Sequence, residues 1–383
     1  MGKRVKIGLI FSLNEEWIAG SYYLLNLIHA LNHGVKKDLP EITIISSKKS
    51  DFEETQKTRY PYLKYRNPYH IKRNLWEAAI NRIVKIISGK DFIDKHISDK
   101  DIDVLYPASF DSIFKNVTKK LFWIPDFQEH YLTDFFSKEE IEGRIMHQQS
   151  LVKNKQPIVF SSENAKADFA KFYPGATCKT FVLNFAVSNT FTDLKTEDVL
   201  KKFGIKGTYF IVSNQFWKHK NHQVVLQAVN ILSKANVACL IIFTGKDSDY
   251  RNPLFPESIR SFIKGNNLES KIKIVGFISR EEQMVLMKGS LAIIQPSLFE
   301  GWSTVVEDAK ALSKPIILSD IAVHREQISN NCTFFNPKDS EQLAEILRRK
   351  LDNTAGADED SYLDYNLNIQ RFGREFLSIA KEI

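Results

Sequence analysis

Residues 295–327 read QPSLFEGWSTVVEDAKALSKPIILSDIAVHREQ. The stretch opens at the end of an apolar run, Leu291–Ile294, which has the pattern of a buried strand. Pro296 ends that strand, and Ser303 or Thr304 can cap a helix that runs to about residue 312. The stretch therefore predicts a strand, a loop and a helix in immediate succession.

A second apolar run, Ile316–Leu318, predicts the strand that follows this helix. Strand, loop, helix and strand in this order form the repeating unit of a parallel α/β sheet. Ligands of such sheets bind beyond the carboxyl ends of the strands, which is where Glu300 and Gly301 stand. An acid beside a glycine, followed by a helix N-terminus, is suited to hold a sugar and a phosphate. A helix capped by an acidic turn is the alternative interpretation.

The whole segment resembles the donor-site signature of retaining glycosyltransferases of family 4, the glycosyl transferases group 1 of bacterial polysaccharide synthesis, which have the GT-B fold. That signature is a Glu, seven residues and a second Glu. Glu300 matches the first position, and Asp308, one methylene shorter than Glu, matches the second. Glu307 points about 100° away around the helix, so it replaces residue 308 only in a shifted register. The resemblance implies that Glu300 binds a donor-sugar hydroxyl and that Asp308 binds the ribose hydroxyls.

Length and composition fit two soluble domains. The 383 residues exceed one ordinary core, and two domains of about 190 residues lie in the usual size range. Hydrophobic residues make up 43% and charged residues 26%, as in globular proteins. The three cysteines form no metal-ligand spacing and indicate a reducing compartment. No apolar run reaches the roughly 18 residues of a membrane span, so we expect a cytoplasmic protein, if bound to a membrane then at its inner face.

Strand and helix patterns alternate along both halves of the chain. We expect an α/β protein of GT-B type, with two facing Rossmann-like, doubly wound domains and a cleft between them. The predicted domains are an acceptor-side domain at 1–188 and a nucleotide-sugar donor domain at 189–361. A terminal helix at 362–383 is expected to cross back to the first domain. The resemblance covers nearly all of the second domain and the first only loosely.

The expected elements follow the apolar runs. In the first domain they are strands at 5–11, 42–45, 102–105, 120–124, 156–162 and 182–185, with helices at 21–31, 76–87 and 164–172. In the second they are strands at 209–213, 238–244, 271–275, 291–294 and 316–318, with helices ending near 232, 287 and 312.

Two places in the first domain are candidates for contact with the donor. Gly20 ends the loop before the first helix, where the resemblance implies a glycine loop that closes over the diphosphate; a plain turn is the alternative. Relatives carry a His–Asp pair at the end of the strand that finishes at Ile124. Asp126 fits the Asp and is a catalytic candidate, whereas Pro125 stands at the His position and His130 follows four or five residues later.

In the second domain the resemblance implies basic residues that hold the diphosphate. Lys220 matches the family's Lys before a helix, but Asn214–Gln215 replace the usual Gly–Arg, and Lys218 is the candidate to supply the missing charge. Gly276 and Phe277 match positions that contact the base, largely through backbone. The full set of expected donor-binding residues is Gly20, Gln215, Lys218, Gly245, Gly276, Phe277, Gly301, Trp302, Ser303, Thr304, Val305 and Asp308, with Glu300, Lys220 and Asp126 as the catalytic residues.

A basic and aromatic stretch lies at residues 57–73, with six Lys or Arg and four Tyr, and Trp76, Ile80, Ile83 and Ile87 then recur at helical spacing. This pattern is typical of a surface that meets anionic lipid or a lipid-linked acceptor. Single-stranded nucleic acid is a weaker alternative, and we expect no nucleic-acid partner. A solvated loop before a core-facing helix is the third interpretation. The net charge of +7 fits anionic partners.

The expected chemistry needs neither cofactor nor metal. Asp247 and Asp249 mimic a metal-binding Asp–x–Asp motif, but their polar loop is expected to be a solvated turn. Charge on the departing diphosphate would instead be met by Lys220 and by the amides near Ser303–Val305. The substrates are then a GDP- or UDP-sugar and a glycan or lipid-linked acceptor. A nucleotide-sugar 2-epimerase and a non-catalytic sugar-nucleotide binding protein are the alternatives.

Overall fold

The computed structural model describes residues 4–14, 18–34, 38–69, 75–88, 97–188, 194–352 and 365–383. The predicted domain boundary at 188/189 borders residues 189–193, and the predicted start of the terminal helix at 362 falls within 353–364. Both stretches lie outside the described residues, so these boundaries stay predictions.

The first half of the chain alternates short parallel strands with helices. Its strands are β1 (Lys6–Ile10), β2 (Glu41–Ile45), β3 (Leu63–Arg66), β4 (Val104–Tyr106), β5 (Phe122–Ile124), β6 (Ile158–Phe160) and β7 (Thr180–Val182). Its helices are α1 (Ile18–Asn32), α2 (Lys49–Gln56), α3 (Leu75–Ser88), α4 (Gln128–Tyr131), α5 (Lys138–Lys153) and α6 (Glu163–Phe172). Strands β3-β2-β1-β4 form one sheet and β5-β6-β7 another, and the isolated bridge between Leu105 and Lys120 joins them.

The second half is one continuous sheet of six parallel strands in the order β10-β9-β8-β11-β12-β13. The strands are β8 (Phe210–Ser213), β9 (Ile241–Thr244), β10 (Ile272–Gly276), β11 (Ile293–Gln295), β12 (Ile316–Ser319) and β13 (Cys332–Phe335). The helices are α7 (Thr196–Lys202), α8 (His222–Lys234), α9 (Phe255–Gly265), α10 (Arg280–Gly289), α11 (Thr304–Ala311), α12 (Ala322–Gln327) and α13 (Ser340–Asp352). The strand order reverses between β8 and β11, and open α/β sheets bind ligands at such a switch point.

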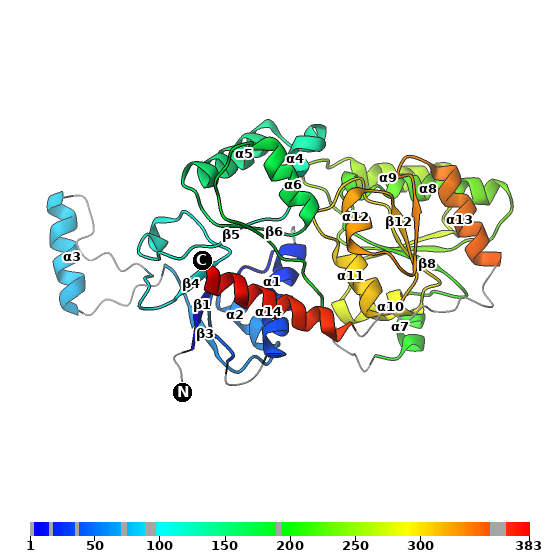
Figure 1. Ribbon diagram of the computed structural model, residues 1–383. Coiled ribbons are helices and arrows are strands. Elements are labelled where there is room, and N and C mark those ends of the chain that lie inside the picture. The colour runs from blue at the N-terminus through cyan, green and yellow to red at the C-terminus, as the bar shows by residue number, and fades with distance from the viewer. Residues whose placement is uncertain are drawn as a thin grey trace.

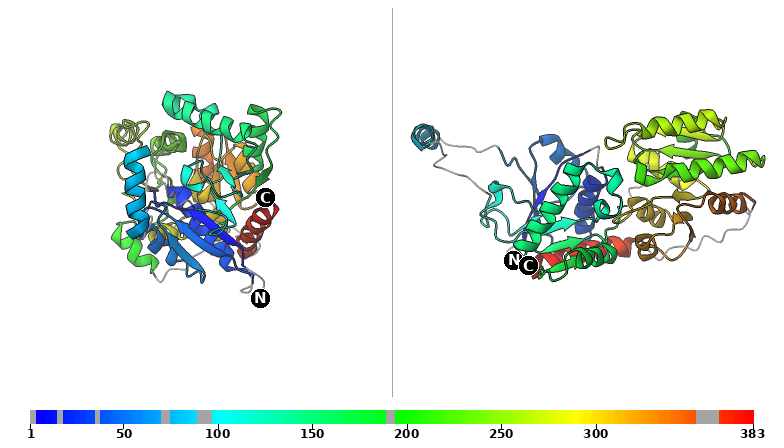
Figure 2. Two further views of the ribbon diagram at one scale, coloured as in Figure 1. Left: turned by 90° about the vertical axis from the view of Figure 1, so that its left-hand side faces the viewer. Right: turned by 90° about the horizontal axis from the view of Figure 1, so that it is seen from above.

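The last helix, α14 (Asn366–Glu382), follows the second half in sequence but packs against α1 of the first (Figure 1). Phe372 and Phe376 are fully buried there. Gly373 permits the close approach, because a Cβ at this position would meet the carbonyl oxygen of Ala30 at 2.6 Å. Figure 2 shows the two halves side by side, with α14 along the first.

Four local expectations need correction. Gly20 lies in the first turn of α1 and not in the preceding loop, since the helix already begins at Ile18. The predicted loop at 57–73 contains β3, which pairs with β2. The strand expected at 182–185 ends at Val182. The helix at 76–87 does not face the core: Trp76 is 81% exposed, and α3 stands apart from both sheets in Figures 1 and 2.

Candidate active site

A cleft of about 540 Å³ lies between the two halves, where the carboxyl ends of β8 and β11 meet α1 and β5 across the gap. Of the predicted site residues, thirteen line it: Glu300, Lys220, Asp126, Gly20, Gln215, Gly245, Phe277, Gly301, Trp302, Ser303, Thr304, Val305 and Asp308. Residues more than 280 positions apart in the sequence therefore share one cavity, at the switch point of the second sheet.

Lys220 and Glu300 form an ion pair in this cleft, with Nζ and Oε1 2.6 Å apart. Gln295, the last residue of β11, donates its side-chain amide to the same Oε1 at 2.8 Å, and Asn214 donates in turn to Gln295. Both charged side chains are largely withdrawn from water. The ends of two adjacent strands thus fix the Glu300 carboxylate before any ligand arrives.

The loop that carries Lys220 is pinned by Asn221, which has a left-handed backbone (φ 56°). Its side-chain amide donates to the carbonyl oxygens of Pro296 and Pro337 at 3.0 and 2.8 Å. A left-handed residue here lets the chain reverse sharply from the short turn Lys218–Lys220 into α8, which is a conformation that Asn adopts at little cost. Lys220 is thereby held in place by the neighbouring loop.

The N-terminus of α11 opens into the cleft. Ser303 is the N-cap, and its hydroxyl accepts the amide of Val306. The backbone amide of Ser303, which we expected to face the diphosphate, donates to Gln327 at 3.0 Å, so this part of the prediction was wrong. Gln327 also returns a bond to the carbonyl oxygen of Ser303. Thr304 and Val305, the first two residues of the helix, remain the candidates for binding an anion.

Gly301 lies close against the first half. A Cβ there would meet the carbonyl oxygen of Pro125 at 2.4 Å and the Cβ of Asp126 at 3.0 Å. Only a glycine fits between them, so the Glu–Gly turn of the second half can lie against the end of β5. Gly245 has a similar role beside β8, since its added Cβ would meet the carbonyl oxygen of Asn214 at 2.1 Å.

Asp308 lines the cleft as predicted, but its carboxylate already has a partner. Arg280, the first residue of α10, donates from Nη1 to Oδ2 at 2.7 Å and from Nη2 to Oδ1. Asp308 is fully buried, and the guanidinium also lies over the ring of Tyr22 from the first half. Sequence reasoning missed Arg280. Its signal is the capping box of Ser279 and Glu282, which places residue 280 at a helix start just beyond β10.

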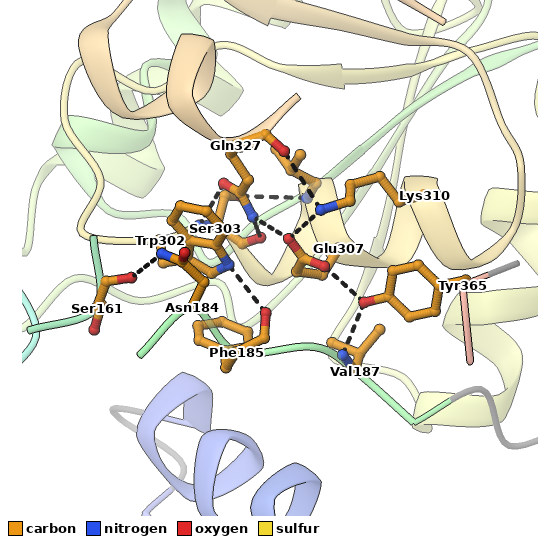
Figure 3. Close-up of polar contacts among 11 residues, drawn as sticks. Ser161, Asn184, Phe185, Val187, Trp302, Ser303, Glu307, Lys310, Gln327 and Tyr365 are labelled. Carbon is orange, nitrogen blue, oxygen red and sulfur yellow. Dashed lines mark hydrogen bonds and ion pairs between the residues drawn. The ribbon is translucent and has the colours of Figure 1, made fainter. Parts of the chain in front are cut away.

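Glu307, the alternative second acid, points toward Lys310, Gln327 and Tyr365 (Figure 3) and is not among the residues that line the cleft. Its carboxylate accepts from Lys310 at 2.7 Å, from Gln327 at 2.9 Å and from the hydroxyl of Tyr365 at 2.7 Å. Tyr365 stands just before α14 and accepts the amide of Val187 from the first half. Burial, with the Glu307 charge second, raises the pKa of Tyr365 well above its usual value, so the phenol stays protonated and donates. Glu307 thus links α11 to Tyr365, just before α14, and through Tyr365 to Val187 of the first half.

Asp126 projects from the end of β5 into the cleft and accepts the amide of Gln128 at 3.1 Å. Burial raises its pKa above the ordinary value, although the charge of Arg144 opposes the shift. His130 does not line the cleft: its ring stacks on Phe172 with centroids 4.0 Å apart. Pro125 does line it, at the position where relatives place a His.

Two predicted donor residues lie outside the cleft lining. Lys218 directs its Nζ over the ring of Phe135, 4.7 Å from the centroid, so it does not supply the missing cation. Gly276 has φ 77°, and its carbonyl oxygen accepts the amide of Gly245 at 2.9 Å. Its role is therefore to hold the ends of β9 and β10 together, while the neighbouring Phe277 reaches the cleft.

The Asp247–Asp249 loop is not a solvated turn. Asp249 is 4% exposed and accepts the backbone amides of Lys218, Arg251 and Asn252. Such a carboxylate organises the loop by satisfying buried donors. Among the residues that the structure describes, no group of three or more His, Cys, Asp or Glu side chains could hold a metal ion.

Residues 196–367 match the family described as Glycosyl transferases group 1. The match lies in the second half of the chain. The O-antigen chain mannosyltransferase RfbU of Salmonella typhimurium is 26% identical over 225 residues, and the match spans 59% of this chain and 59% of that protein.

Solved structures resemble the whole chain. A glycosyltransferase from Rickettsia africae has a TM-score of 0.67 at 17% identity, with 100% of this chain and 99% of that chain covered. Anabaena HepE, in complex with UDP and glucose, has a TM-score of 0.64 at 13% identity, with 99% and 98% covered. These likenesses confirm the predicted GT-B fold. Within the described part of the chain, no helix has the length and apolarity to cross a membrane.

Proposed function

We propose that this protein is a retaining, metal-independent glycosyltransferase. It transfers a hexose-type sugar from a GDP- or UDP-sugar to a glycan or a lipid-linked acceptor during surface polysaccharide synthesis. The group 1 domain and the O-antigen mannosyltransferase similarity support this class of reaction. The observation that carries the proposal is the Lys220–Glu300 pair beside the N-terminus of α11, inside a cleft between two α/β halves.

The pair and the helix fit the charges that such a transfer creates. As the bond to the anomeric carbon breaks, negative charge grows on the leaving diphosphate. In this proposal Lys220 and the first amides of α11, which line the cleft, meet that charge without a metal. Glu300, fixed by Gln295, is placed to accept a hydroxyl of the donor sugar and so orient its ring.

Retention of configuration would then proceed by front-face displacement, with the departing phosphate taking the proton of the acceptor hydroxyl. Glu300 is a poor nucleophile for a covalent route, because one of its carboxylate oxygens already accepts from both Lys220 and Gln295. We therefore assign it to positioning of the sugar and not to attack on the anomeric carbon.

Incubation of the purified protein with a panel of nucleotide sugars and acceptors, read by mass spectrometry, tests the proposal. A glycosylated acceptor with the donor's anomeric configuration, formed at the same rate in EDTA, is the expected result. Free isomerised nucleotide sugar would indicate an epimerase, and binding without turnover a non-catalytic sugar-nucleotide protein. Loss of activity on chelation, restored by manganese or magnesium, would overturn the metal-independent part.

We further propose that α3 brings the first half to an anionic membrane surface, where a lipid-linked acceptor would be found. Trp76, Ile83, Ile86 and Ile87 are between 57% and 81% exposed on this helix, with Arg82 exposed among them. An amphipathic helix of this kind inserts its apolar side at the boundary between headgroups and acyl chains.

Co-flotation with vesicles tests this second proposal. Binding to vesicles with anionic lipid is expected to fall strongly in Ile83→Ser/Ile86→Ser. Leu254→Ser removes a similarly exposed apolar side chain (83%) from the second half and should leave flotation unchanged. Equal flotation of both variants would contradict a role for α3 in membrane binding. Sugar transfer to a soluble acceptor should be unchanged in both variants.

A further inference from the structure

Arg280 is a cleft residue that none of the predicted contacts accounts for. It is the first residue of α10, shortly after β10, and it lines the cavity. Both of its terminal nitrogens donate to the Asp308 carboxylate. Its side chain is 19% exposed and that of Asp308 is fully buried. Tyr22 of the first half covers the guanidinium, with 5.7 Å between the Cζ atom and the ring centroid. The pair therefore lies where the two halves meet.

The guanidinium of Arg280 has N–H groups that Asp308 does not use. Arginine carries five N–H groups, and Asp308 takes one from each of two nitrogens. No other acceptor for them occurs among the residues that the structure describes. The guanidinium can therefore hold Asp308 and still donate to a ligand in the cavity that both side chains line.

The position of Asp308 on α11 sets where that ligand group would lie. Thr304 and Asp308 are four residues apart, so they share one face of the helix, with about 5–6 Å between their Cβ atoms. If the terminal phosphate of a nucleoside diphosphate sits at the helix N-terminus, the inner phosphate and the ribose extend along this face. The inner phosphate and the ribose would then lie next to the Arg280–Asp308 pair.

We infer that Arg280 is a donor-binding residue that acts as one unit with Asp308, its free N–H groups taking the inner phosphate and Asp308 the ribose hydroxyls of a nucleoside diphosphate. The inference rests on the proposed function. It also supplies the second phosphate cation, since Asn214–Gln215 carry no charge and Lys218 lies over Phe135.

The pairing also explains how a fully buried acid can face an anionic ligand. An unpaired Asp308 carboxylate would repel a diphosphate strongly in a cavity of low polarity. Arg280 neutralises it and leaves lone pairs on both oxygens free for hydroxyl donors. The planar guanidinium can bind a carboxylate on one side and a phosphate on another. The ammonium group of Lys cannot reproduce this geometry.

Titration calorimetry on four proteins tests the inference. They are the wild type, Arg280→Met, Arg280→Lys and a matched control, Arg325→Met. Arg325 of α12 also donates from two nitrogens, Nε and Nη2, to an aspartate, Asp320, but both of these side chains are exposed. The ligands are UDP, UMP and uridine, and GDP, GMP and guanosine, with thermal melting to verify folding.

Loss of a charged hydrogen bond predicts that Arg280→Met binds the preferred diphosphate and monophosphate about 10- to 150-fold more weakly, with a smaller loss for the nucleoside. Arg280→Lys should lie between this variant and the wild type, and Arg325→Met should bind as the wild type does. If Arg280→Met does not fold, Arg280→Lys decides through the same ligands.

Wild-type affinity for the diphosphate in a folded Arg280 variant would overturn the inference. An equal loss for nucleoside and diphosphate would overturn the phosphate contact. A wild-type protein that binds none of the six ligands would instead contradict the proposed function itself, so the two failures are distinguishable.

Discussion

The two walls of the cleft are built from different kinds of contact. On the wall of the second half, charged groups are already paired with one another: Lys220 with Glu300 and Arg280 with Asp308. On the facing wall, the Asp126 carboxylate accepts one hydrogen bond among the described residues, from the amide of Gln128, and burial raises its pKa. One wall therefore holds its charged groups in pairs, whereas the other holds an acid in an unfavourable environment.

Part of the first-half wall is aromatic. Tyr23 stacks on Trp123 with ring centroids 4.2 Å apart, and Phe185 stands edge-on to the same Tyr23. All three line the cleft. Aromatic faces can pack against the C–H surfaces of a sugar without fixing its charge, so this wall suits a neutral ligand part. We infer that the second half holds the nucleotide and that the first half shapes the space for the sugars.

The largest effect is expected from Lys220→Ala, which removes a charge from the wall of the second half. Removing one preorganised donor to a developing anion typically costs about 10²–10³ in turnover. Diphosphate affinity should fall together with turnover, because Lys220 meets the phosphate in both the ground and the transition state. Donor kinetics and calorimetry with UDP and GDP measure the two effects.

Lys57→Ala is the control for Lys220→Ala, since Lys57 is an exposed lysine that pairs with Glu54 and is not among the residues that line the cleft. Unchanged diphosphate affinity in folded Lys220→Ala would show that the wall is organised for some other group.

The adjacent acids of α11 give the next largest effect and the sharpest internal comparison. Asp308→Ala should raise the Michaelis constant for donor about 10- to 150-fold and lower turnover less, because the ribose contact is equal in ground and transition states. Asp308→Glu should be tolerated. Glu307→Ala should chiefly destabilise the fold, since it leaves Lys310, Gln327 and Tyr365 without their shared acceptor.

Donor kinetics together with thermal melting of Asp308→Ala and Glu307→Ala separate these roles. A raised Michaelis constant in Glu307→Ala with an unchanged melting temperature would support the shifted register, in which Glu307 is the ribose ligand. The structure supports Asp308 as the ribose ligand, because the Glu307 carboxylate points toward Tyr365 (Figure 3).

A smaller effect, on stability, is expected from Asp249→Ala. This buried carboxylate accepts three backbone amides in the loop after β9, and its loss leaves them unsatisfied. A cost of about 1–3 kcal/mol in the free energy of unfolding follows. Denaturant unfolding measures it, with the exposed Asp320→Ala as the control. A silent Asp249→Ala would restore the solvated-turn interpretation, and rescue of its activity by a metal ion would contradict a purely structural role.

Local sequence patterns predicted the alternation of strands and helices, and the family resemblance added the GT-B arrangement. The helix capped by Ser303, the strands beside it and the switch-point location of Glu300 follow from apolar runs and capping residues. What could not be predicted are pairings between distant segments. Arg280 binds Asp308 across 28 positions, and Tyr365 reaches Glu307 across 58, because tertiary packing brings those elements together.

The same limit explains the errors. Lys218 has a favourable place in the sequence, two residues before Lys220, yet its side chain turns to the aromatic ring of Phe135 in the other half. The amide of Ser303 is free in an isolated helix, but Gln327 from the following helix takes it. Neither Phe135 nor Gln327 can be identified as a partner from a single segment of the sequence.

The smallest effect is expected on the unfavourable wall, from Asp126→Asn. The pKa of Asp126 is raised above its ordinary value of 3.8, chiefly by burial. The folded protein therefore holds this proton to higher pH than the unfolded chain does. The contribution of Asp126 to stability is fully present below the ordinary value and is lost as the pH rises through the raised one. At neutral pH the ionised carboxylate thus costs stability, which Asn, equal in size and still able to accept from Gln128, should recover.

Melting of Asp126→Asn at neutral pH should therefore occur at a higher temperature than in the wild type, by about 1 °C for each kcal/mol recovered in a chain of this length. The difference should shrink as the pH is lowered towards the ordinary carboxyl value, where the wild-type side chain is protonated as well. Turnover should fall at the same time, because Asp126 is a catalytic candidate that lines the cleft, and a charge kept at a cost to stability is a common property of functional sites. A lower melting temperature at neutral pH would mean that the attraction of Arg144 outweighs burial, and that this wall too is organised for charge.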